Sequence, residues 1–394
     1  MIPHPLAIRS MTVTSALGHG LAPTLEALRT CRSGLTSRHF EEVNLQTCLG
    51  LVEGLEEPVP SALRAYDCRN QRLAQYGLEG DGFRQAVQQA AARHGAHRIA
   101  VILGTSTSGI LETEHAYQRR RSDGQLPPDY RYGTVHEFFS VTDFVRRSLG
   151  LQGPALTLST ACSSSAKVFA SASRWLAAGM CDAVVVGGVD SLCLTTLYGF
   201  SSLEIVSSLP CRPADRDRDG ISLGEAAGFA LLERATAADD GPCLLGYGES
   251  SDAYHMSSPQ PEGLGAQRSM ALALASAGLT AADIDYINLH GTATPANDRA
   301  EDHAIAVLFG SATPCSSTKG WTGHTLGAAG IMEAVIALLC LEHHFMAGSL
   351  NTVVVDPTFQ MNVILNNRPA PLSRVLSNSF GFGGSNASLI FGYR

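Results

Sequence analysis

A cysteine in the segment TACSSS, Cys162, occupies a position that favours nucleophilic chemistry. It follows the apolar run 155–158 and precedes a helical stretch. The N-terminus of a helix carries partial positive charge and free N–H groups, and both favour a thiolate. We therefore expect an unusually nucleophilic sulfur, with the Cys162 N–H available to an oxyanion that forms beside it. The alternative is an inert buried thiol, which is the ordinary role of a cysteine.

Two histidines stand in segments rich in small and polar residues. His290 ends an apolar run in INLHGTATPAND, and the ends of strands are where α/β proteins collect their sites. Thr292 and Thr294 follow it and could hydrogen-bond a polar, extended ligand; a histidine packed at a strand end is the alternative. His324, in KGWTGHTLGAAG, opens an apolar helix whose positive potential disfavours an imidazolium. We expect a neutral ring that donates one N–H to a developing negative charge.

A lysine and a glycine-rich loop accompany these residues. Lys319 lies just before His324, and a lysine so near a buried helix needs a carboxylate partner, for which Glu333 is the nearest. The segment NSFGFGGSNA, 378–387, surrounds Phe382 with glycines that permit unusual backbone angles. Such a loop could place an N–H at a site while its aromatic ring gates access. It lacks the K-[ST] of a P-loop.

The elements that must position these residues form an α/β pattern. Continuous apolar runs predict strands covered on both faces, at 99–103, 155–158, 183–189, 229–232, 284–289, 375–379 and 388–391. Helical stretches such as 81–94 and 267–277 alternate with them. Two further helices, one after Cys162 and one over about 325–341, begin with small residues and have little polar surface, so they must be buried on every side. We expect these two helices to lie between two sheets.

A weak similarity between two segments of the sequence predicts two related halves. Residues 156–163 read LTLSTACS and residues 314–324 read PCSSTKGWTGH, each an extended segment followed by a polar turn and a buried helix. The polar segment 234–242, RATAADDGP, would join them. We therefore expect an N-terminal half, 1–236, that carries Cys162, and a C-terminal half, 237–394, that carries His290, Lys319 and His324.

Composition excludes several classes of protein. The chain has 394 residues, 45% of them apolar, and a formal net charge of −8, which argues against non-specific binding to nucleic acid or an anionic membrane. The run Arg119-Arg120-Arg121 could still form a local basic patch, although a solvated loop explains it equally simply. The start MIPHPLAIRS does not resemble a signal peptide, and the apolar runs are too short for a membrane span. Ten scattered cysteines without a paired framework indicate a reducing cytoplasm.

Six ordered motifs together resemble those of elongating β-ketoacyl-acyl-carrier-protein synthases, which belong to the thiolase superfamily. They are TACSSS, RDRDGISLGEAAG, SSDAYHMSSPQPEG, HGTATPAND, KGWTGHTLGAAG and NSFGFGGSNA, and they span the chain from about residue 100 to its end. The resemblance implies a thiolase-like αβαβα layered sandwich of two pseudo-symmetric halves, dimeric through the nucleophile half. It also implies an acyltransferase that needs no metal and no organic cofactor.

The resemblance assigns roles to individual positions. Cys162 would accept the acyl chain, and His290 and His324 would drive decarboxylation of malonyl carrier protein. Lys319 and Glu333 would give electrostatic support, with Glu333 close to the substrate. Thr292 and Thr294 resemble the residues that contact pantetheine. The N–H groups of Phe382 and Cys162 resemble the oxyanion hole, and the Phe382 ring resembles the gate. Arg69 and Arg72 match a basic segment that docks the acyl carrier protein.

The motifs also point to a branch and leave alternatives open. The stretches GTSTSG, SDAYH, HGTATP and PCSSTK resemble ketosynthases of aryl-polyene pigment clusters; ordinary fatty-acid elongation is the main alternative. Trp321 is bulkier than usual after the lysine and could reshape the acyl pocket or the approach of the helix. A thiolase would use a second cysteine and coenzyme A, and a non-catalytic chain-length partner would lack Cys162. Whether the chain forms a homodimer or a heterodimer with a chain-length-factor homologue stays open.

Overall fold

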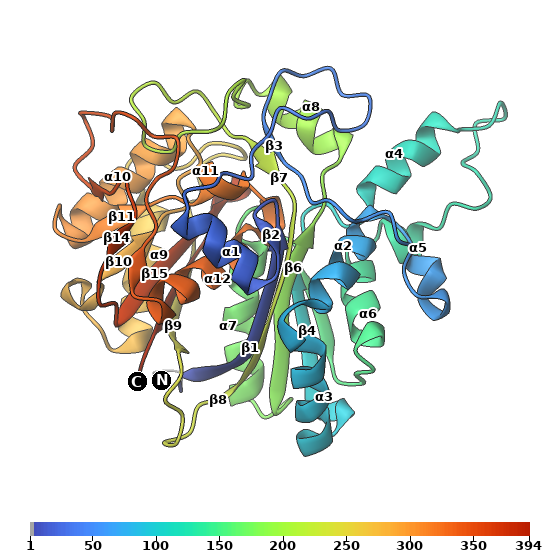
Figure 1. The fold of residues 1–394 in the computed structure, drawn as a ribbon, viewed down its shortest axis with the longest axis horizontal. Coiled ribbons are helices and arrows are strands. Elements are labelled where there is room, and N and C mark those ends of the chain that lie inside the picture. Colours follow the sequence, from blue (N-terminus) through green and yellow to red (C-terminus); the bar gives the residue numbers. More distant parts are fainter. Residues whose placement is uncertain (1–3) are drawn as a thin grey trace.

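Two five-stranded arrangements dominate the computed structural model, which describes residues 4–394 (Figure 1). The first runs in the order β5 (Ala155–Leu158), β4 (Ile99–Gly104), β6 (Ala183–Asp190), β8 (Ala226–Arg234) and β1 (Leu6–Ser15). The second runs β11 (Pro314–Ser316), β10 (Tyr286–Asn288), β15 (Arg374–Gly381), β16 (Ser385–Gly392) and β9 (Cys243–Ser251). Every residue of β4 and β6 is buried, as their continuous apolar runs predict.

The two arrangements repeat one topology. If the five strands of each half are numbered in chain order, both halves have the spatial order third, second, fourth, fifth, first. The pairing directions also match: β4 and β10 are each parallel to both of their neighbours, and the other pairs within each half are antiparallel. This confirms two pseudo-symmetric halves. The sheets are not separate, because β1 and β9 pair at Leu6–Leu244 and Ala7–Cys243 and so make one hydrogen-bonded sheet. A boundary between residues 236 and 237 stays a prediction; the segment 234–242 connects β8 to β9.

Two buried helices fill the space between the halves. Helices α7 (Ser164–Ala177) and α12 (Ala329–Glu342) contact each other and strands of both halves. Residues 329–341 of α12 are all buried, as its apolar composition predicts. Small residues allow the close approach, since a Cβ on Gly330 would lie 2.4 Å from the backbone nitrogen of Ala166. The helix starts at Ala329, later than the predicted 325, because a 3₁₀ turn, Leu326–Ala328, precedes it.

Outer helices complete five layers. Helices α2 (Arg69–Leu78), α3 (Phe83–His94) and α6 (Phe139–Ser148) cover the first half, and α9 (Leu264–Ala277) and α10 (Pro295–Phe309) cover the second. The layers confirm the predicted αβαβα sandwich. The remaining helices are α1 (Leu21–Arg29), α4 (Ile110–Gln118), α5 (Tyr132–Val135), α8 (Leu194–Ser202) and α11 (Lys319–Thr322). The remaining strands are the short β2 (Gly18–His19), β3 (Leu49–Gly50), β7 (Leu223–Gly224), β12 (Phe345–Met346), β13 (Asn362–Val363) and β14 (Arg368–Pro369).

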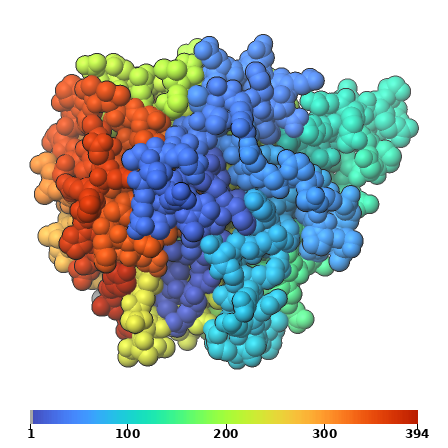
Figure 2. Space-filling model, in the orientation of Figure 1, coloured from blue at the N-terminus to red at the C-terminus, as the bar shows by residue number. Residues whose placement is uncertain are grey.

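One segment stands away from the body of the molecule. Helix α4 and the loop that follows it project sideways, as the space-filling view shows at the right (Figure 2). The cluster Arg119–Arg121 lies in this arm, where Arg119 pairs with Glu112 and Asp129. No helix within residues 4–394 is both long and apolar enough to cross a membrane.

Candidate active site

Cys162 lies in a tight turn between β5 and α7. Its side chain is buried, and α7 begins two residues later at Ser164. The preceding residue, Ala161, has a φ of 52°, a left-handed conformation that costs a non-glycine residue of the order of 1 kcal/mol. Gly381 of the glycine-rich loop packs against this turn, and a Cβ there would lie 2.6 Å from the Thr160 carbonyl oxygen. The turn is therefore held in a conformation that presents the sulfur to the cavity.

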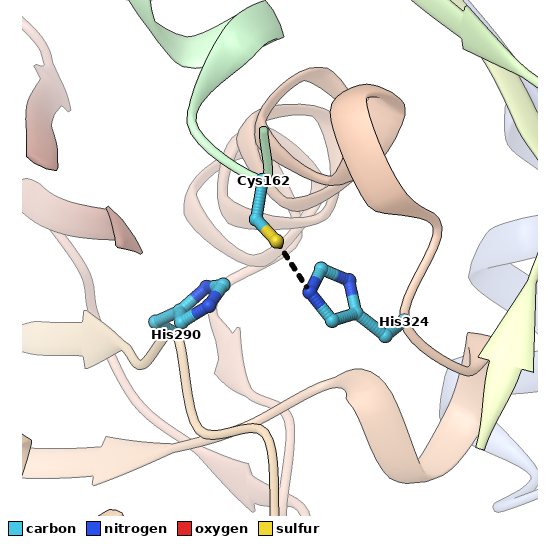
Figure 3. A group of neighbouring side chains, drawn as sticks. All are labelled: Cys162, His290 and His324. Carbon is cyan, nitrogen blue, oxygen red and sulfur yellow. Dashed lines mark hydrogen bonds between the residues drawn. The ribbon is translucent and has the colours of Figure 1, made fainter. Parts of the chain in front are cut away.

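The two predicted histidines flank this sulfur (Figure 3). His324 Nε2 lies 3.0 Å from Cys162 Sγ, and the two imidazole rings lie 5.4 Å apart, edge to face. His290 follows the end of β10, and His324 lies in the turn between α11 and the 3₁₀ helix. His290 and His324 follow Cys162 by 128 and 162 positions in the sequence, yet the three side chains meet at one point. The structure confirms that the three side chains form one cluster.

The hydrogen bonds of both rings define the position of their protons. The Leu326 N–H donates to Nδ1 of His324 over 3.3 Å, and the Lys319 ammonium donates to Nδ1 of His290 over 3.2 Å. Burial, and then the charge of Lys319, hold the pKa of each histidine well below its usual value. Because each neutral ring accepts at Nδ1, each carries its proton on Nε2. Both histidines therefore present an N–H to the space beside Cys162.

Lys319 and Glu333 form the expected buried ion pair. The Lys319 ammonium also donates to the His290 carbonyl oxygen, so it holds both the ring and the backbone of that residue. Burial raises the pKa of Glu333 to about 7, and Lys319 opposes this rise. Glu333 is not among the residues that line the cavity, and its contact with substrate stays a prediction. Its role is to hold Lys319.

The acidity of Cys162 differs from the sequence-based expectation. Burial raises the pKa of its thiol to about 11, although the charge of Lys319 and the N–H of Phe382 lower it. The expectation of a stabilised thiolate is therefore wrong for the resting protein, because the cost of burying the charge exceeds these contributions. Burial thus works against the thiolate, and the charge of Lys319 works for it.

A cavity of about 250 Å³ opens at the cluster. Thr292 and Thr294 line it, and their hydroxyl groups lie 2.9 Å apart. Contact of these threonines with a bound ligand stays a prediction. Further lining residues are the apolar Phe200, Ile205, Ile221 and Phe380 and the polar Ser257, Ser258, Asn297 and Asn386. Trp321 is not among them: it is buried in the main core and donates to the Gly348 carbonyl, so it does not reshape the pocket wall.

Phe382 closes one side of this cavity. Its ring lies edge to face with Phe200, 5.6 Å between centroids, and the side chain is only partly buried. Gly383 and Gly384 follow with φ of 79° and 74°, angles that disfavour other residues. The backbone N–H of Phe382 lowers the pKa of the Cys162 thiol, and its role as an oxyanion-hole donor stays a prediction. Movement of the ring stays a prediction.

The two predicted carrier-docking residues are engaged within the chain. Arg69 forms an ion pair with Glu225, whose side chain is fully buried, and Arg72 forms one with Asp67. Glu225 in turn accepts from the backbone N–H groups of Val52 and Leu192. The Arg69 side chain therefore stabilises the fold through its ion pair with Glu225. Its contact with a carrier protein stays a prediction.

Sequence reasoning missed a carboxylate that holds the His290 turn. Glu301, buried on α10, accepts from the backbone N–H groups of His290 and Gly291, each over 2.8 Å. Asn378 of the glycine-rich loop donates to it over 3.2 Å. Burial raises the pKa of Glu301 to about 7. The sequence did place acidic residues in the helix that follows His290. The run ANDRAED contains three of them, however, and nothing in the sequence indicates which one holds the turn.

The cluster could also hold a metal ion on geometric grounds. The ligand atoms of Cys162, His290 and His324 lie within 4.8 Å of one another, and sulfur and imidazole nitrogen are ligands that Zn²⁺ accepts. Two observations disfavour this use. The Lys319 ammonium lies against His290, so it would repel a dication, and the Nε2 atoms that face the sulfur carry protons. The set is better suited to stabilise a negative charge.

Comparison with known proteins agrees with this chemistry. Residues 73–238 match the family model "Beta-ketoacyl synthase, N-terminal domain", and residues 243–353 match "Beta-ketoacyl synthase, C-terminal domain". The chain is 32% identical to 3-oxoacyl-[acyl-carrier-protein] synthase 2 of Vibrio cholerae, over 98% of both chains. It is 42% identical to the synthase of the same name from Rhizobium meliloti, over 74% of this chain and 73% of that one.

Solved structures give the same result. The ketosynthase ApeO of Xenorhabdus doucetiae, solved in complex with its chain length factor ApeC, is 40% identical and superposes with a TM-score of 0.91 over 99% of this chain and 98% of the other. A β-ketoacyl synthase from Burkholderia phymatum is 28% identical, with a TM-score of 0.88 over 99% and 100%. The shared fold, the matches over nearly the whole chain and the clustered cysteine and histidines lead to one conclusion: the chain belongs to the β-ketoacyl synthase family.

Proposed function

We propose that the protein is an elongating 3-oxoacyl-[acyl-carrier-protein] synthase, which joins an acyl chain to malonyl carrier protein with loss of carbon dioxide. The observation that carries this proposal is the pair of Nε2–H donors, on His290 and His324, on either side of the Cys162 sulfur. A nucleophile beside two neutral donors can accept an acyl group and then stabilise an enolate in the same cavity.

The first half-reaction loads the enzyme. The Cys162 sulfur attacks the thioester carbonyl of an acyl carrier, the new S–C bond forms, and the carrier's own C–S bond breaks. The proton of the Cys162 thiol ends on the departing carrier thiol, so the transfer needs no net base. Because the thiolate is the attacking species, the proton must leave Cys162 as the S–C bond forms, and it ends on the departing carrier sulfur. The N–H groups of Cys162 and Phe382 hold the transient oxyanion.

The second half-reaction forms the carbon–carbon bond. The bond between the malonyl carboxylate and the adjacent carbon breaks, carbon dioxide leaves, and the electron pair moves onto the thioester oxygen as an enolate. His290 and His324 donate their Nε2–H groups to that oxygen. The enolate carbon attacks the acyl carbonyl on Cys162, and collapse of the oxyanion expels the sulfur, which takes up a proton. A 3-oxoacyl carrier results.

The cavity disfavours two other functions. A thiolase needs a second cysteine beside the nucleophile, but within residues 4–394 Cys162 is the one cysteine that lines this cavity. A non-catalytic chain-length partner would lack the nucleophile, yet Cys162 is present and is in hydrogen-bond contact with His324. The arrangement therefore fits the catalytic subunit.

For the pathway we propose the aryl-polyene branch, with a chain-length-factor homologue as partner. Its support is the 40% identity to ApeO, which was solved with its chain length factor, over nearly the whole of both chains. The ishigamide ketosynthase, also solved with a chain length factor, superposes with a TM-score of 0.90 at 25% identity. Fatty-acid elongation is the alternative, supported by the relatives named 3-oxoacyl-[acyl-carrier-protein] synthase 2. Assays with polyunsaturated and with saturated acyl carriers separate the two.

Mass spectrometry of the intact protein tests the core proposal. Incubation with an acyl carrier should add one acyl group, and Cys162→Ala should abolish that adduct and the formation of 3-oxoacyl product. A cysteine matched for burial, Cys340, serves as control, because it is buried in α12 away from the cavity. Cys340→Ala should retain the adduct. An acyl group on the Cys162→Ala protein would refute the assignment of the nucleophile.

We also propose a cytoplasmic location. Its support is chemical: all ten cysteines are free thiols and nine of them are buried, which suits a reducing compartment. Fractionation of cells that express the protein at its native level tests this, and recovery from a periplasmic or secreted fraction would contradict it.

A further inference from the structure

A fully buried carboxylate, Asp190, lies at the end of β6 behind the catalytic cluster. It does not line the cavity, and within residues 4–394 its hydrogen bonds go to neither Cys162 nor the two histidines. Its oxygens accept from the Thr105 hydroxyl over 2.6 Å and from the backbone N–H groups of Ser106 and Thr107 over 2.9 Å each. These bonds organise the turn that follows β4.

The same carboxylate reaches the turn that carries His324. Its second oxygen accepts from the Gly327 N–H over 2.5 Å. Gly327 has no room for a side chain, since a Cβ would lie 2.6 Å from Asp190 Oδ2 and 2.7 Å from the Ser106 nitrogen and hydroxyl oxygen. One residue earlier, Leu326 has a φ of 53° and donates to Nδ1 of His324. The orientation of the His324 ring therefore depends on where the Asp190 carboxylate holds this turn.

Ser106 extends the contact to the nucleophile. Its hydroxyl donates to the Ala161 carbonyl oxygen over 3.2 Å, and Ala161 is the left-handed residue directly before Cys162. Asp190 thus holds the cysteine turn through Ser106 and the histidine turn through Gly327. The two turns come from different halves of the molecule, and Asp190 joins them behind the 3.0 Å contact between sulfur and imidazole.

We propose that Asp190 is a positioning residue that sets the distance between Cys162 Sγ and His324 Nε2, acting through Ser106 and Gly327. This inference rests on the proposed function where its test measures the rate of condensation, but not where it measures chemical alkylation of Cys162. Because a misplacement of about 1 Å can cost about a hundredfold in rate, loss of this link should lower kcat while leaving KM for the carrier substrates nearly unchanged.

Gly327→Ala is the sharpest test, because it keeps every charge and inserts a methyl group between Asp190 and the histidine turn. We expect kcat for condensation to fall about ten- to a hundredfold at an unchanged KM. Gly246→Ala in β9 is the matched control, since its Cβ would meet α9 atoms at a similar 2.7 Å, far from the cluster. It should lower the melting temperature but leave kcat as in the wild type.

Two further measurements keep the test decisive. The rate at which iodoacetamide alkylates Cys162 does not depend on the substrate, and it should fall in Gly327→Ala, because the sulfur loses the His324 donor. Ser106→Ala, which removes only the hydroxyl bond to Ala161, should show a smaller loss of the same kind and covers the case in which Gly327→Ala fails to fold. Wild-type kcat and alkylation in both variants would overturn the proposal. If Cys162 of the wild-type protein is alkylated but the protein does not catalyse condensation, the proposed function would instead be refuted.

Discussion

At the scale of single residues, the two histidines reach one protonation state by different means. A backbone N–H fixes the His324 tautomer, whereas a lysine ammonium fixes that of His290. In the proposed reaction, each ring offers one N–H to the same thioester oxygen. We predict that His290→Ala and His324→Ala each slow carbon dioxide release about a hundred- to a thousandfold, which is the typical cost of losing one oxyanion donor.

Acylation separates this role from a loss of folding. Both variants should still gain an acyl group on Cys162 in intact-mass measurements, because the loading step uses the backbone N–H groups of Cys162 and Phe382. Radioactive malonyl carrier gives the decarboxylation rate. Carbon dioxide release close to the wild-type rate in either variant would contradict the assignment of that histidine.

The directions of the pKa shifts predict the pH dependence of the two half-reactions. Burial lowers the pKa of His290 and His324, so both stay neutral below 6.5, the usual value for histidine. Carbon dioxide release should therefore persist as the pH falls through 6.5. Burial raises the pKa of Cys162 to about 11, so its alkylation rate should still be rising above pH 9.0, where an ordinary thiol levels off. A decline of decarboxylation centred near 6.5 would show that a histidine ionises there.

The buried pair of Lys319 and Glu333 makes a prediction about stability as well as rate. Lys319→Met leaves a buried carboxylate without its partner, which should cost about 3–5 kcal/mol in the free energy of unfolding. The double variant Lys319→Met/Glu333→Leu should recover most of that stability, as measured in urea. It should not recover decarboxylation, because nothing then donates to Nδ1 of His290. Recovery of both would mean that the lysine acts only through the fold.

The sequence predicted which side chains come together but not their pKa values. Cys162 and the two histidines stand out because strand ends and small-residue helices flank them. The pKa of Cys162 could not be predicted, because it depends on how deeply the turn is buried, and depth is a property of the assembled layers. The partner of Arg69 was missed for a similar reason: Glu225 lies 156 residues further along the chain.

At the scale of elements, helices and buried strands followed from composition, but two long strands were missed along with the strands of only two residues. Strands β1 and β9 are not continuous apolar runs, since LAIRSMTVTS and CLLGYGESS mix polar and glycine residues. They are the strands that join the halves, so missing them also hid the continuity of the sheet. The start of α12 was predicted too early because hydrophobic periodicity does not distinguish a 3₁₀ turn from the first turn of an α-helix.

The glycine-rich loop carries a prediction of its own. The Phe382 ring is partly exposed and packs on Phe200 at the cavity wall, and it belongs to none of the hydrophobic clusters formed by the described residues. Phe382→Ala should therefore lower stability by far less than the roughly 3–5 kcal/mol of a core phenylalanine. It should change the relative rates at which short and long acyl chains load onto Cys162. A large loss of stability with an unchanged chain-length preference would end the gate hypothesis.

At the scale of the whole molecule, the active site lies between the two pseudo-symmetric halves. The first contributes Cys162 and the second contributes both histidines, and α7 and α12 pack against each other between them. Packing of those helices brings the cysteine turn and the histidine turn close to each other, and Asp190 joins the two turns. The two halves differ in their surfaces: within residues 4–394 the first presents the projecting arm, together with aromatic residues that include Tyr132 and Phe138, exposed by 58% and 41%.

Those exposed aromatic residues lead to the prediction about assembly. Aromatic side chains are enriched in protein interfaces, and the nucleophile half is where the family resemblance places the dimer contact. We predict that the protein and a chain-length-factor homologue, when co-expressed, elute as one complex with one copy of each chain. The variant Tyr132→Glu/Phe138→Glu should fold normally, since both side chains face solvent, yet fail to retain its partner in native mass spectrometry. Leu272→Glu on α9 is the matched control, exposed by 42% on the opposite half, and should keep the complex. Loss of the partner in the control alone would place the interface on the second half, and retention in both would move it away from the aromatic residues of the first half.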